Sequence, residues 1–324
     1  MIETDPASPG DGRTAHIAKP PTASPPANRM DLTIALPDGR VLGYAEYGDP
    51  DGVPIIGMHG TPGSRRMFEI ANEAAAALNI RLLAPERPGF GISSYHSGRD
   101  LRSYAQDIAA FADTLGISRF AVAGVSGGGP YAAACAAFLP ERVTALGLVS
   151  PIGPMAGKEK PPSIGPGHAF AFRYGPRMKP LMALIFSVGR LAFLHAPNLI
   201  FGFILSRAAP SDWAVLSRRE IRRNLIRGVA EGCRPGIGAS LQEMRLFSRP
   251  WDVPLEKIEA PAFLWQGLSD RNVPVSAALR LGELIKGCRV TRIANAGHYW
   301  IFDNVPLVLA TLADAYKSRT AGDK

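Results

Sequence analysis

Strand-like and helix-like segments alternate along most of this chain, and the alternation constrains the fold more than any other feature. Short apolar runs typical of strands lie at residues 53–58, 80–84, 120–125, 143–149, 262–266 and 289–293. Helical patterns lie between or after them, at residues 64–78, 101–115, 128–138, 276–285 and 299–317. Alternating strands and helices form mostly parallel sheets with helices on both faces. The sequence therefore predicts an α/β fold. It begins with a predicted β-hairpin, in which Asp38-Gly39 forms the turn between strands at residues 31–37 and 40–47.

The alternation stops for about a hundred residues and then resumes, which predicts one fold interrupted by an insertion. Residues 151–250 are rich in Phe, Leu, Met and Arg with Pro and Gly breaks, and they indicate a helical cap. The predicted core is therefore formed by residues 31–150 and 251–318. Residues 1–30 hold many prolines and no apolar periodicity, so we predict a disordered tail there.

The net charge of +8 is concentrated in that insertion. Residues 152–250 carry 15 Lys and Arg against 5 Asp and Glu, whereas the rest of the chain carries 21 against 23. A nucleic-acid-binding protein usually spreads or stripes its positive charge over the main fold, so we expect no nucleic-acid partner. The sequence gives no sign of a particular oligomeric state.

The sequence also indicates a compartment. Cys135, Cys233 and Cys288 are odd in number and widely spaced, so they offer neither a disulfide framework nor a zinc motif. The first residues lack the pattern of a secretory signal. The longest apolar stretch, at residues 181–205, is interrupted by Arg190, His195 and Pro197, which favours buried cap helices. We therefore expect a cytoplasmic protein.

The segment Gly124-Val125-Ser126-Gly127-Gly128 has the form G-x-S-x-G, with an apolar strand before it and an Ala-rich helix after it. In this context the serine sits on a sharp strand-to-helix turn, exposed for nucleophilic attack. Small residues are needed two positions before and after it, and Gly124 and Gly128 meet that need. Taken alone, the motif also fits a serine that only caps a helix.

A nucleophilic serine needs a base and an acid that orients the base. Of the six histidines, His298 follows the last strand and so lies on the same carboxyl edge of the sheet as Ser126. Asp270 follows the strand at 262–266 on that edge, and the order Ser126, Asp270, His298 is that of α/β-hydrolase triads. Asp252 and Asp303 are weaker alternatives to Asp270.

An oxyanion hole requires backbone N–H groups aimed at the developing charge. We expect the amide of Gly127, directly after the nucleophile, and that of Thr61, in the loop after the strand at 53–58. In the same loop, a bracing role through hydrogen bonds is favoured for His59 over direct chemistry. Candidate residues for the substrate pocket are His59, Gly60, Val125, Phe170, Phe172 and Tyr299.

Taken together, these segments resemble the α/β-hydrolase fold family, over residues 31 to about 317. The resemblance rests on five motifs: His59–Gly63, Arg87–Gly91, Gly124–Gly128, Gly267–Pro274 and Gly297-His298. It implies an eight-stranded, mostly parallel sheet, a helical cap after the sixth strand, and a triad of Ser126, His298 and Asp270 that uses no cofactor and no metal. A serine at the elbow excludes the haloalkane dehalogenase and epoxide hydrolase branches, which carry an aspartate there.

The resemblance leaves several activities open. The favoured one is a serine hydrolase that cleaves an ester, thioester or lactone of a small, largely apolar molecule. The loop His59–Gly63 is also similar to that of proline iminopeptidases, although the elbow differs and the cap is basic instead of acidic. Carbon–carbon bond hydrolases and a catalytically silent binding module remain as alternatives.

Two features of the predicted cap bear on what it contacts. Its Phe and Met residues fit either an apolar substrate pocket or the cap's own core. Its arginines cluster on one predicted helix, at Arg218, Arg219, Arg222, Arg223 and Arg227. A solvated helix face is the favoured explanation of this cluster, ahead of attraction of an anionic substrate or contact with an anionic membrane surface.

Overall fold

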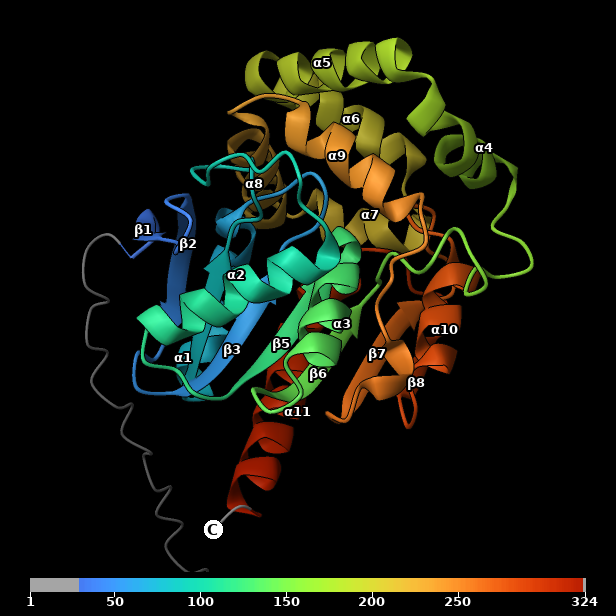
Figure 1. Ribbon diagram of the computed structural model, residues 1–324. Helices are drawn as coiled ribbons and strands as arrows, with labels where there is room; N and C mark the ends of the chain where they lie inside the picture. The colour runs from blue at the N-terminus through green and yellow to red at the C-terminus, as the bar shows by residue number, and fades with distance from the viewer. Residues whose placement is uncertain (1–28, 323–324) are drawn as a thin grey trace, which may run out of the picture.

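A computed structural model describes residues 29–322 of the chain and shows one eight-stranded sheet (Figure 1). The tail predicted for residues 1–30 lies outside the described residues, apart from its last two positions. The strands stand in the order β1-β2-β4-β3-β5-β6-β7-β8. Their bounds are β1 Leu32–Ala35, β2 Val41–Gly48, β3 Val53–Met58, β4 Ile80–Pro85, β5 Phe120–Val125, β6 Val143–Val149, β7 Ala262–Gly267 and β8 Arg289–Ile293.

The pairing confirms the predicted α/β class with a mostly parallel sheet. Strands β1 and β2 form the expected antiparallel hairpin, and β2 also pairs antiparallel with β4. The remaining neighbours are parallel, with Met58 opposite Gly124 and Val149 opposite Trp265. The carboxyl ends of these parallel strands therefore meet at one edge, where ligands bind in open α/β sheets.

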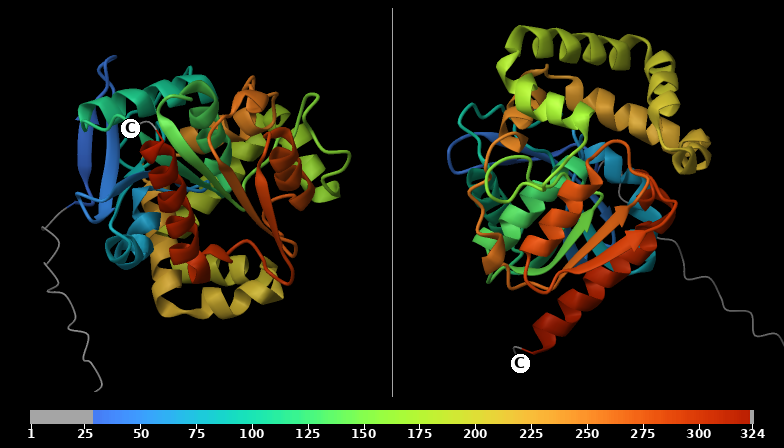
Figure 2. Two further views of the ribbon diagram at one scale, coloured as in Figure 1. Left: turned by 90° about the horizontal axis from the view of Figure 1, so that it is seen from below. Right: turned by 90° about the vertical axis from the view of Figure 1, so that its right-hand side faces the viewer.

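Helices cover both faces of the sheet, so each face has its own apolar core (Figure 2). One core joins the sheet to α2 (Leu101–Thr114), α3 (Gly129–Phe138) and α10 (Val275–Leu284). The other joins it to α1 (Asn72–Ala77) and α11 (Ile301–Ala321). Strand β5 is apolar throughout, and β6 is apolar except for the buried Thr144, because both of their faces are covered.

Between β6 and β7 the described chain forms α-helices from Pro166 to Phe247. The helices are α4 Pro166–Tyr174, α5 Lys179–His195, α6 Pro197–Arg207, α7 Pro210–Ser217, α8 Arg219–Cys233 and α9 Gly238–Phe247. They lie above the carboxyl ends of the strands, with α5 farthest from the sheet (Figure 1). We call this group of helices the cap.

The expectation of buried cap helices at residues 181–205 is wrong for α5, which has no buried residue and carries an exposed apolar stripe. Leu184, Ile185 and Val188 are each at least half exposed, and Leu181 and Leu191 continue the stripe by one turn on either side. Among the described residues, no single helix passes a length and hydropathy test for crossing a membrane. The segments Pro166–Arg177 and Lys179–His195 pass it only as a pair, with a bend of 111° between them.

One predicted helix differs in form. Residues 64–78 were expected to form one helix, but the structure has a 3-10 helix at Arg65–Ala71 followed by α1. The guanidinium of Arg65 explains the difference, since it is buried and pairs with Glu86 (2.6 Å) and Glu231 (2.8 Å). These tertiary contacts bind the first turn to the core and the cap instead of leaving it as a regular surface helix.

Candidate active site

Ser126 lies at the tight turn where β5 passes into the helix that follows. Its φ is +54°, a left-handed conformation that is uncommon for a residue other than glycine and costs backbone strain. A 3-10 turn at Ser126–Gly128 then leads into α3. The side chain is half-buried, so its hydroxyl stands at the surface of the sheet edge rather than in the core.

The two predicted glycines are required by close packing around this turn. A Cβ on Gly124 would stand 2.5 Å from the carbonyl oxygen of Gly128. A Cβ on Gly128 would stand 2.1 Å from the carbonyl oxygen of Met58. Neither position has room for a side chain, and the turn is therefore pressed against the end of β3.

Asp270 and His298 contact each other directly. The Nδ1 of His298 lies 2.8 Å from Oδ2 of Asp270, whose side chain is fully buried. The other carboxylate oxygen, Oδ1, accepts the backbone amides of Asn272 (2.8 Å) and Val273 (3.0 Å). With Nδ1 held by the carboxylate, Nε2 is the ring nitrogen left for chemistry. Asp303, one of the alternatives to Asp270, pairs with Arg218 instead, and Asp252 is exposed.

The loops that carry these two residues are bonded to each other. The amide of Ser269 donates to the carbonyl of Ala296 at 2.9 Å, so the loop after β8 lies against the end of β7. A Cβ on Gly267 would stand 2.5 Å from the carbonyl oxygens of Ala296 and Gly297. Both loops leave the carboxyl edge of the sheet, which is also the edge that Ser126 occupies.

The electrostatics of the pair favour a charged acid and a basic imidazole. Burial acts to raise the pKa of Asp270, but the charge and hydrogen bond of His298 and the two amides outweigh it, and the pKa is lowered. Burial acts to lower the pKa of His298, but the charge and hydrogen bond of Asp270 and the charge of Asp212 raise it above its ordinary value. His298 is therefore a stronger base than a free imidazole.

The loop after β3 brings Thr61 and Gly60 beside the elbow. A Cβ on Gly127 would stand 3.2 Å from the amide nitrogen of Thr61, so the two residues proposed as oxyanion donors face each other. A Cβ on Gly60 would stand 3.5 Å from the Cβ of Ser126 and 3.9 Å from its Oγ. The space beside the serine hydroxyl is thus bounded by the backbone of this loop.

His59 has hydrogen bonds at both ring nitrogens. Nδ1 lies 2.8 Å from the carbonyl oxygen of Gly60, and Nε2 accepts the amide of Arg87 at 3.3 Å. Burial, together with the charge of Arg87, holds the pKa of His59 well below its ordinary value, so the ring is neutral. These contacts describe a histidine that braces its own loop.

A buried ion pair that sequence reasoning missed holds the same loop. Arg87 donates to the carbonyl oxygens of His59 and Gly60 and to Oγ1 of Thr61 (2.9 Å). Its guanidinium also pairs with Glu243 of α9 at 2.5 Å, and both side chains are fully buried. Thr61 in turn donates its hydroxyl to Glu243. A cap helix therefore fixes the loop that would supply an oxyanion donor.

Asp212, at the start of α7, is a second cap residue that sequence reasoning missed. Its two carboxylate oxygens accept the backbone amides of His298 and Tyr299, each at 3.1 Å. The side chain is buried, and a Cβ on Gly297 would stand 2.0 Å from Oδ2. Asp212 therefore positions the loop that carries the histidine. An acid in the first turn of a helix is common, so the sequence held no specific signal for it.

The remaining candidate pocket residues are distributed unevenly. Val125 is half-buried next to Ser126, and the ring of Tyr299 meets that of His298 edge-on at 5.4 Å. Phe172 packs partly buried against the larger core, whereas Phe170 is 55% exposed. Phe201 belongs to the cap's own core.

Of the clustered arginines, Arg219, Arg223 and Arg227 are exposed on α8, as a solvated helix face requires.

The described residues contain no group of three or more His, Cys, Asp or Glu side chains arranged to hold a metal ion. The arrangement that they do contain is a half-buried serine on a strained turn, a paired imidazole and carboxylate, and a braced loop of backbone donors. Such a set of groups can carry out nucleophilic acyl transfer.

Residues 55–311 match the model of the alpha/beta hydrolase family. Among solved structures, the chain is similar to an alpha/beta hydrolase fold protein from Nakamurella multipartita. That likeness has a TM-score of 0.66 and 21% identity, and covers 89% of this chain and 99% of the other. At this identity the likeness bears on the fold alone.

Two curated relatives match a smaller share of this chain at higher sequence identity. The chain is 33% identical to a non-heme chloroperoxidase of Streptomyces lividans over 39% of this chain and 46% of the relative. It is 27% identical to a bifunctional esterase/perhydrolase of Acinetobacter calcoaceticus over 82% of this chain and 92% of the relative. The chain covers less than half of the length of several curated relatives that it matches.

Proposed function

This chain belongs to the alpha/beta hydrolase family, and on that premise we propose that it is a serine hydrolase. The substrate is a carboxylic ester, or a thioester or lactone, of a small and largely apolar molecule. The observation that carries the proposal is the hydrogen bond between His298 and Asp270, on the same sheet edge as the strained turn of Ser126. The esterase named among the relatives gives further support.

In the first step His298 takes the proton of the Ser126 hydroxyl on Nε2, and the serine Oγ attacks the carbonyl carbon. The resulting oxyanion is stabilised by the amides of Gly127 and Thr61, each donor being worth about 3 kcal/mol in comparable sites. Asp270 keeps the imidazole oriented and stabilises the imidazolium without accepting the proton. When the bond to the leaving group breaks, His298 returns its proton to that group.

In the second step water replaces the serine as nucleophile. His298 removes a proton from the water, the hydroxide attacks the acyl carbon, and Ser126 leaves with the proton that His298 returns. The products are a carboxylic acid and an alcohol or a thiol, whereas a lactone gives a single ring-opened hydroxy acid. Every proton passes through one imidazole, which is why its orientation by Asp270 and Asp212 matters to the rate.

A panel of p-nitrophenyl esters of graded acyl length tests the proposal, with an aminoacyl anilide and a lactone included. We expect turnover of the esters and none of the anilide. A peptidase would turn over the anilide in preference to the esters, and a silent binding module would turn over nothing.

The matched variants are Ser126→Ala and, as a control, Ser318→Ala on the exposed end of α11. The first should lose at least about 10⁴-fold in kcat, as nucleophile removal does in other serine hydrolases, and the second should behave as the unaltered protein. Near-normal esterase activity in Ser126→Ala would remove the serine from the mechanism.

A further inference from the structure

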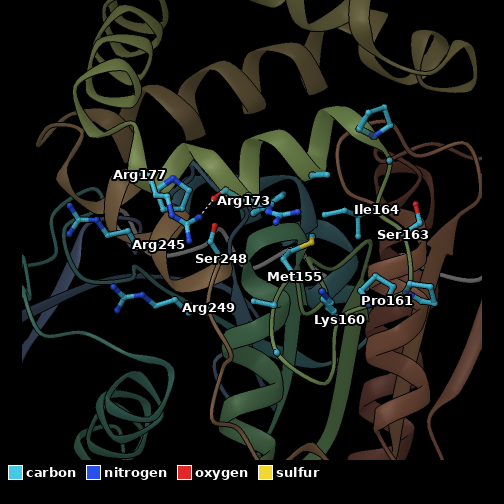
Figure 3. A pocket seen from close by; sticks show the side chains of 18 of the residues that line it. Met155, Lys160, Pro161, Ser163, Ile164, Arg173, Arg177, Arg245, Ser248 and Arg249 are labelled. Carbon is cyan, nitrogen blue, oxygen red and sulfur yellow. Dashed lines mark hydrogen bonds between the residues drawn. The ribbon is translucent and has the colours of Figure 1, made fainter.

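A large cavity lies between the cap and the chain that leads into it. Its volume is about 910 Å³, and its walls come from residues 155–166, α4, the 3-10 turn Gly175–Arg177 and the end of α9 (Figure 3). None of the triad residues lines it. The cavity is therefore a separate site from the one to which we assign the chemistry.

The charged residues that line the cavity all carry the same sign. They are Lys160, Arg173, Arg177, Lys179, Arg245 and Arg249, and the lining contains no Asp or Glu. The carboxylate of Glu159 lies near one wall, close to Gly157. Even with that charge included, the cavity holds a strong excess of positive charge and attracts anions.

The side chains are placed so that one ligand could meet several of them. In Figure 3 Lys160 and Arg173 approach the cavity from different walls, while Arg245 and Arg249 lie together at one side. Arg177 donates to the backbone carbonyl of Arg173, which ties the two arginines of the upper wall together. Guanidinium groups suit carboxylate, phosphate and sulfate, because their planar donors match two oxygens at once.

Part of the cavity lining is apolar. Met155 is buried, and Ile164 and Phe172 pack partly buried against the larger hydrophobic core. A small hydrophilic anion would leave this surface in contact with water. A ligand that carries both an anionic group and an alkyl or aromatic part would cover it and meet the cations at the same time.

We propose that this cavity binds amphiphilic anions, in which a carboxylate, phosphate or sulfate group is joined to an apolar part. A second copy of the chain is a poor occupant for it, since the cap that would be inserted carries the same excess of positive charge. The chain also links the cavity to the elbow, because the amide of Ile152, three residues before Met155, donates to the carbonyl of Ser126 at 2.9 Å.

Calorimetric titration of the full chain with octyl phosphate, below the concentration at which it aggregates, tests the proposal. The Ser126→Ala protein is used alongside the unaltered one, so that turnover plays no part and failure of the proposed hydrolase function leaves the result intact. We expect saturable binding that weakens as NaCl is raised, since salt screens exposed charges. Neutral octyl glucoside should bind at least tenfold more weakly, and equal affinity for the two would overturn the proposal.

The variant Lys160→Gln/Arg173→Gln locates the binding, because both side chains are exposed and line the cavity. Its control is Arg219→Gln/Arg223→Gln on α8, which removes the same charge from exposed positions outside the cavity. We expect about tenfold weaker binding of octyl phosphate by the first pair and a change of less than about twofold by the second. Equal weakening by both pairs would show diffuse attraction to the cap and would contradict a site in the cavity.

Sedimentation with vesicles separates a free ligand from a lipid headgroup. Vesicles of phosphatidylcholine with and without phosphatidylglycerol are compared, using the same two variants. If the unaltered protein binds the anionic vesicles and the Lys160→Gln/Arg173→Gln variant does not, the ligand is the headgroup of a membrane lipid. Binding of octyl phosphate without vesicle binding would identify a soluble amphiphile, and the absence of both would overturn the proposal.

Discussion

His298 is held by two carboxylates, one at its imidazole ring and one at its backbone. Asp270 holds one of its ring nitrogens, and Asp212 holds its backbone amide. Both carboxylates also raise its pKa against the effect of burial. The same contacts that orient the base therefore set the pH at which it is neutral and able to accept a proton.

The pH dependence of ester hydrolysis should reflect that raised pKa. Catalysis needs the neutral imidazole, so activity falls as pH drops through the pKa of His298. We expect the acid limb of kcat/KM to have its midpoint above about 6.5, the usual value for histidine. Stopped assays across pH 5–9 measure it. A midpoint clearly below 6.5 would contradict the geometry of the Asp270–His298 pair.

Asp212→Asn should reduce activity without removing any group that reacts. An asparagine offers one acceptor oxygen where two amides need one each, so the loop of His298 loosens. A displacement of about 1 Å can cost as much as 100-fold in rate, and we expect a loss of kcat of tenfold or more.

The same substitution removes a negative charge, so the midpoint of the acid limb should move to lower pH. A purely structural role for Asp212 would leave the midpoint unchanged, and this distinguishes a positioning residue from a merely stabilising one. Asp314→Asn, on the exposed part of α11, is the control.

Ser126, Asp270 and His298 could be selected as candidates from the sequence because each one follows a strand and lies in a recognisable local motif. Asp212 and Glu243 could not, because their role exists only through contacts with residues about 86 and 182 positions away in the chain. Neither lies in a motif, and an acidic residue on a helix has many ordinary explanations. The sequence therefore indicated the groups proposed to react but not the groups that hold them.

At the level of elements, the packing of the elbow against β3 explains why this turn accepts only glycine at two positions. The variant Gly128→Ala would place a methyl group 2.1 Å from the carbonyl oxygen of Met58, which neither backbone can avoid without moving. We expect a loss of stability of about 1–3 kcal/mol, as overpacking usually costs, together with a loss of activity.

Gly202→Ala in α6 is the matched control, since nothing lies within 4 Å of the position of its Cβ. Alanine is favoured over glycine inside a helix by about 1 kcal/mol, so this variant should be as stable as the unaltered protein or more so. Thermal unfolding followed by circular dichroism measures both. A Gly128→Ala protein that melts no lower than Gly202→Ala would refute the close packing at the elbow.

Helix α9 is coupled to the loop of Gly60 and Thr61, which we propose as an oxyanion donor, by the pair of Glu243 with Arg87. Breaking one partner of a fully buried pair leaves an uncompensated charge and costs about 3–5 kcal/mol. We expect Glu243→Gln to lower the free energy of unfolding by about 3 kcal/mol or less, since glutamine retains one acceptor oxygen. The substitution should also impair ester hydrolysis. Glu220→Gln on the exposed start of α8 should change neither.

Denaturant unfolding of the two variants measures the difference. A Glu243→Gln protein with unaltered stability and rate would show that the cap does not fix this loop.

Apolar periodicity predicted the strands well, and β5, β6 and β8 begin and end where the pattern does. It failed at Arg65, whose buried ion pairs impose a 3-10 turn that no local preference indicates. In the cap it predicted helices but not their number, because Pro and Gly breaks there divide a continuous apolar pattern. The local sequence pattern thus predicts whether a segment is a strand or a helix more readily than it predicts the tertiary contacts of that segment.

For the whole molecule, the distribution of charge separates two roles. The core is close to neutral and carries the groups proposed for chemistry, whereas the inserted helices hold the positive excess. Within the cap, α7, α8 and α9 contact the candidate site or the core through Asp212, Glu231 and Glu243. Helix α5 instead exposes an apolar stripe and lies farthest from the sheet (Figure 1).

The measurement that bears most directly on the central claim is labelling with a fluorophosphonate, followed by mass spectrometry of the digested protein. The reagent reacts with a serine whose hydroxyl is activated by a neighbouring base. We predict stoichiometric modification of Ser126, abolished in His298→Ala and slowed as the pH falls below the pKa of His298. Absence of labelling at Ser126 in the folded, unaltered protein, or undiminished labelling in His298→Ala, would contradict the account.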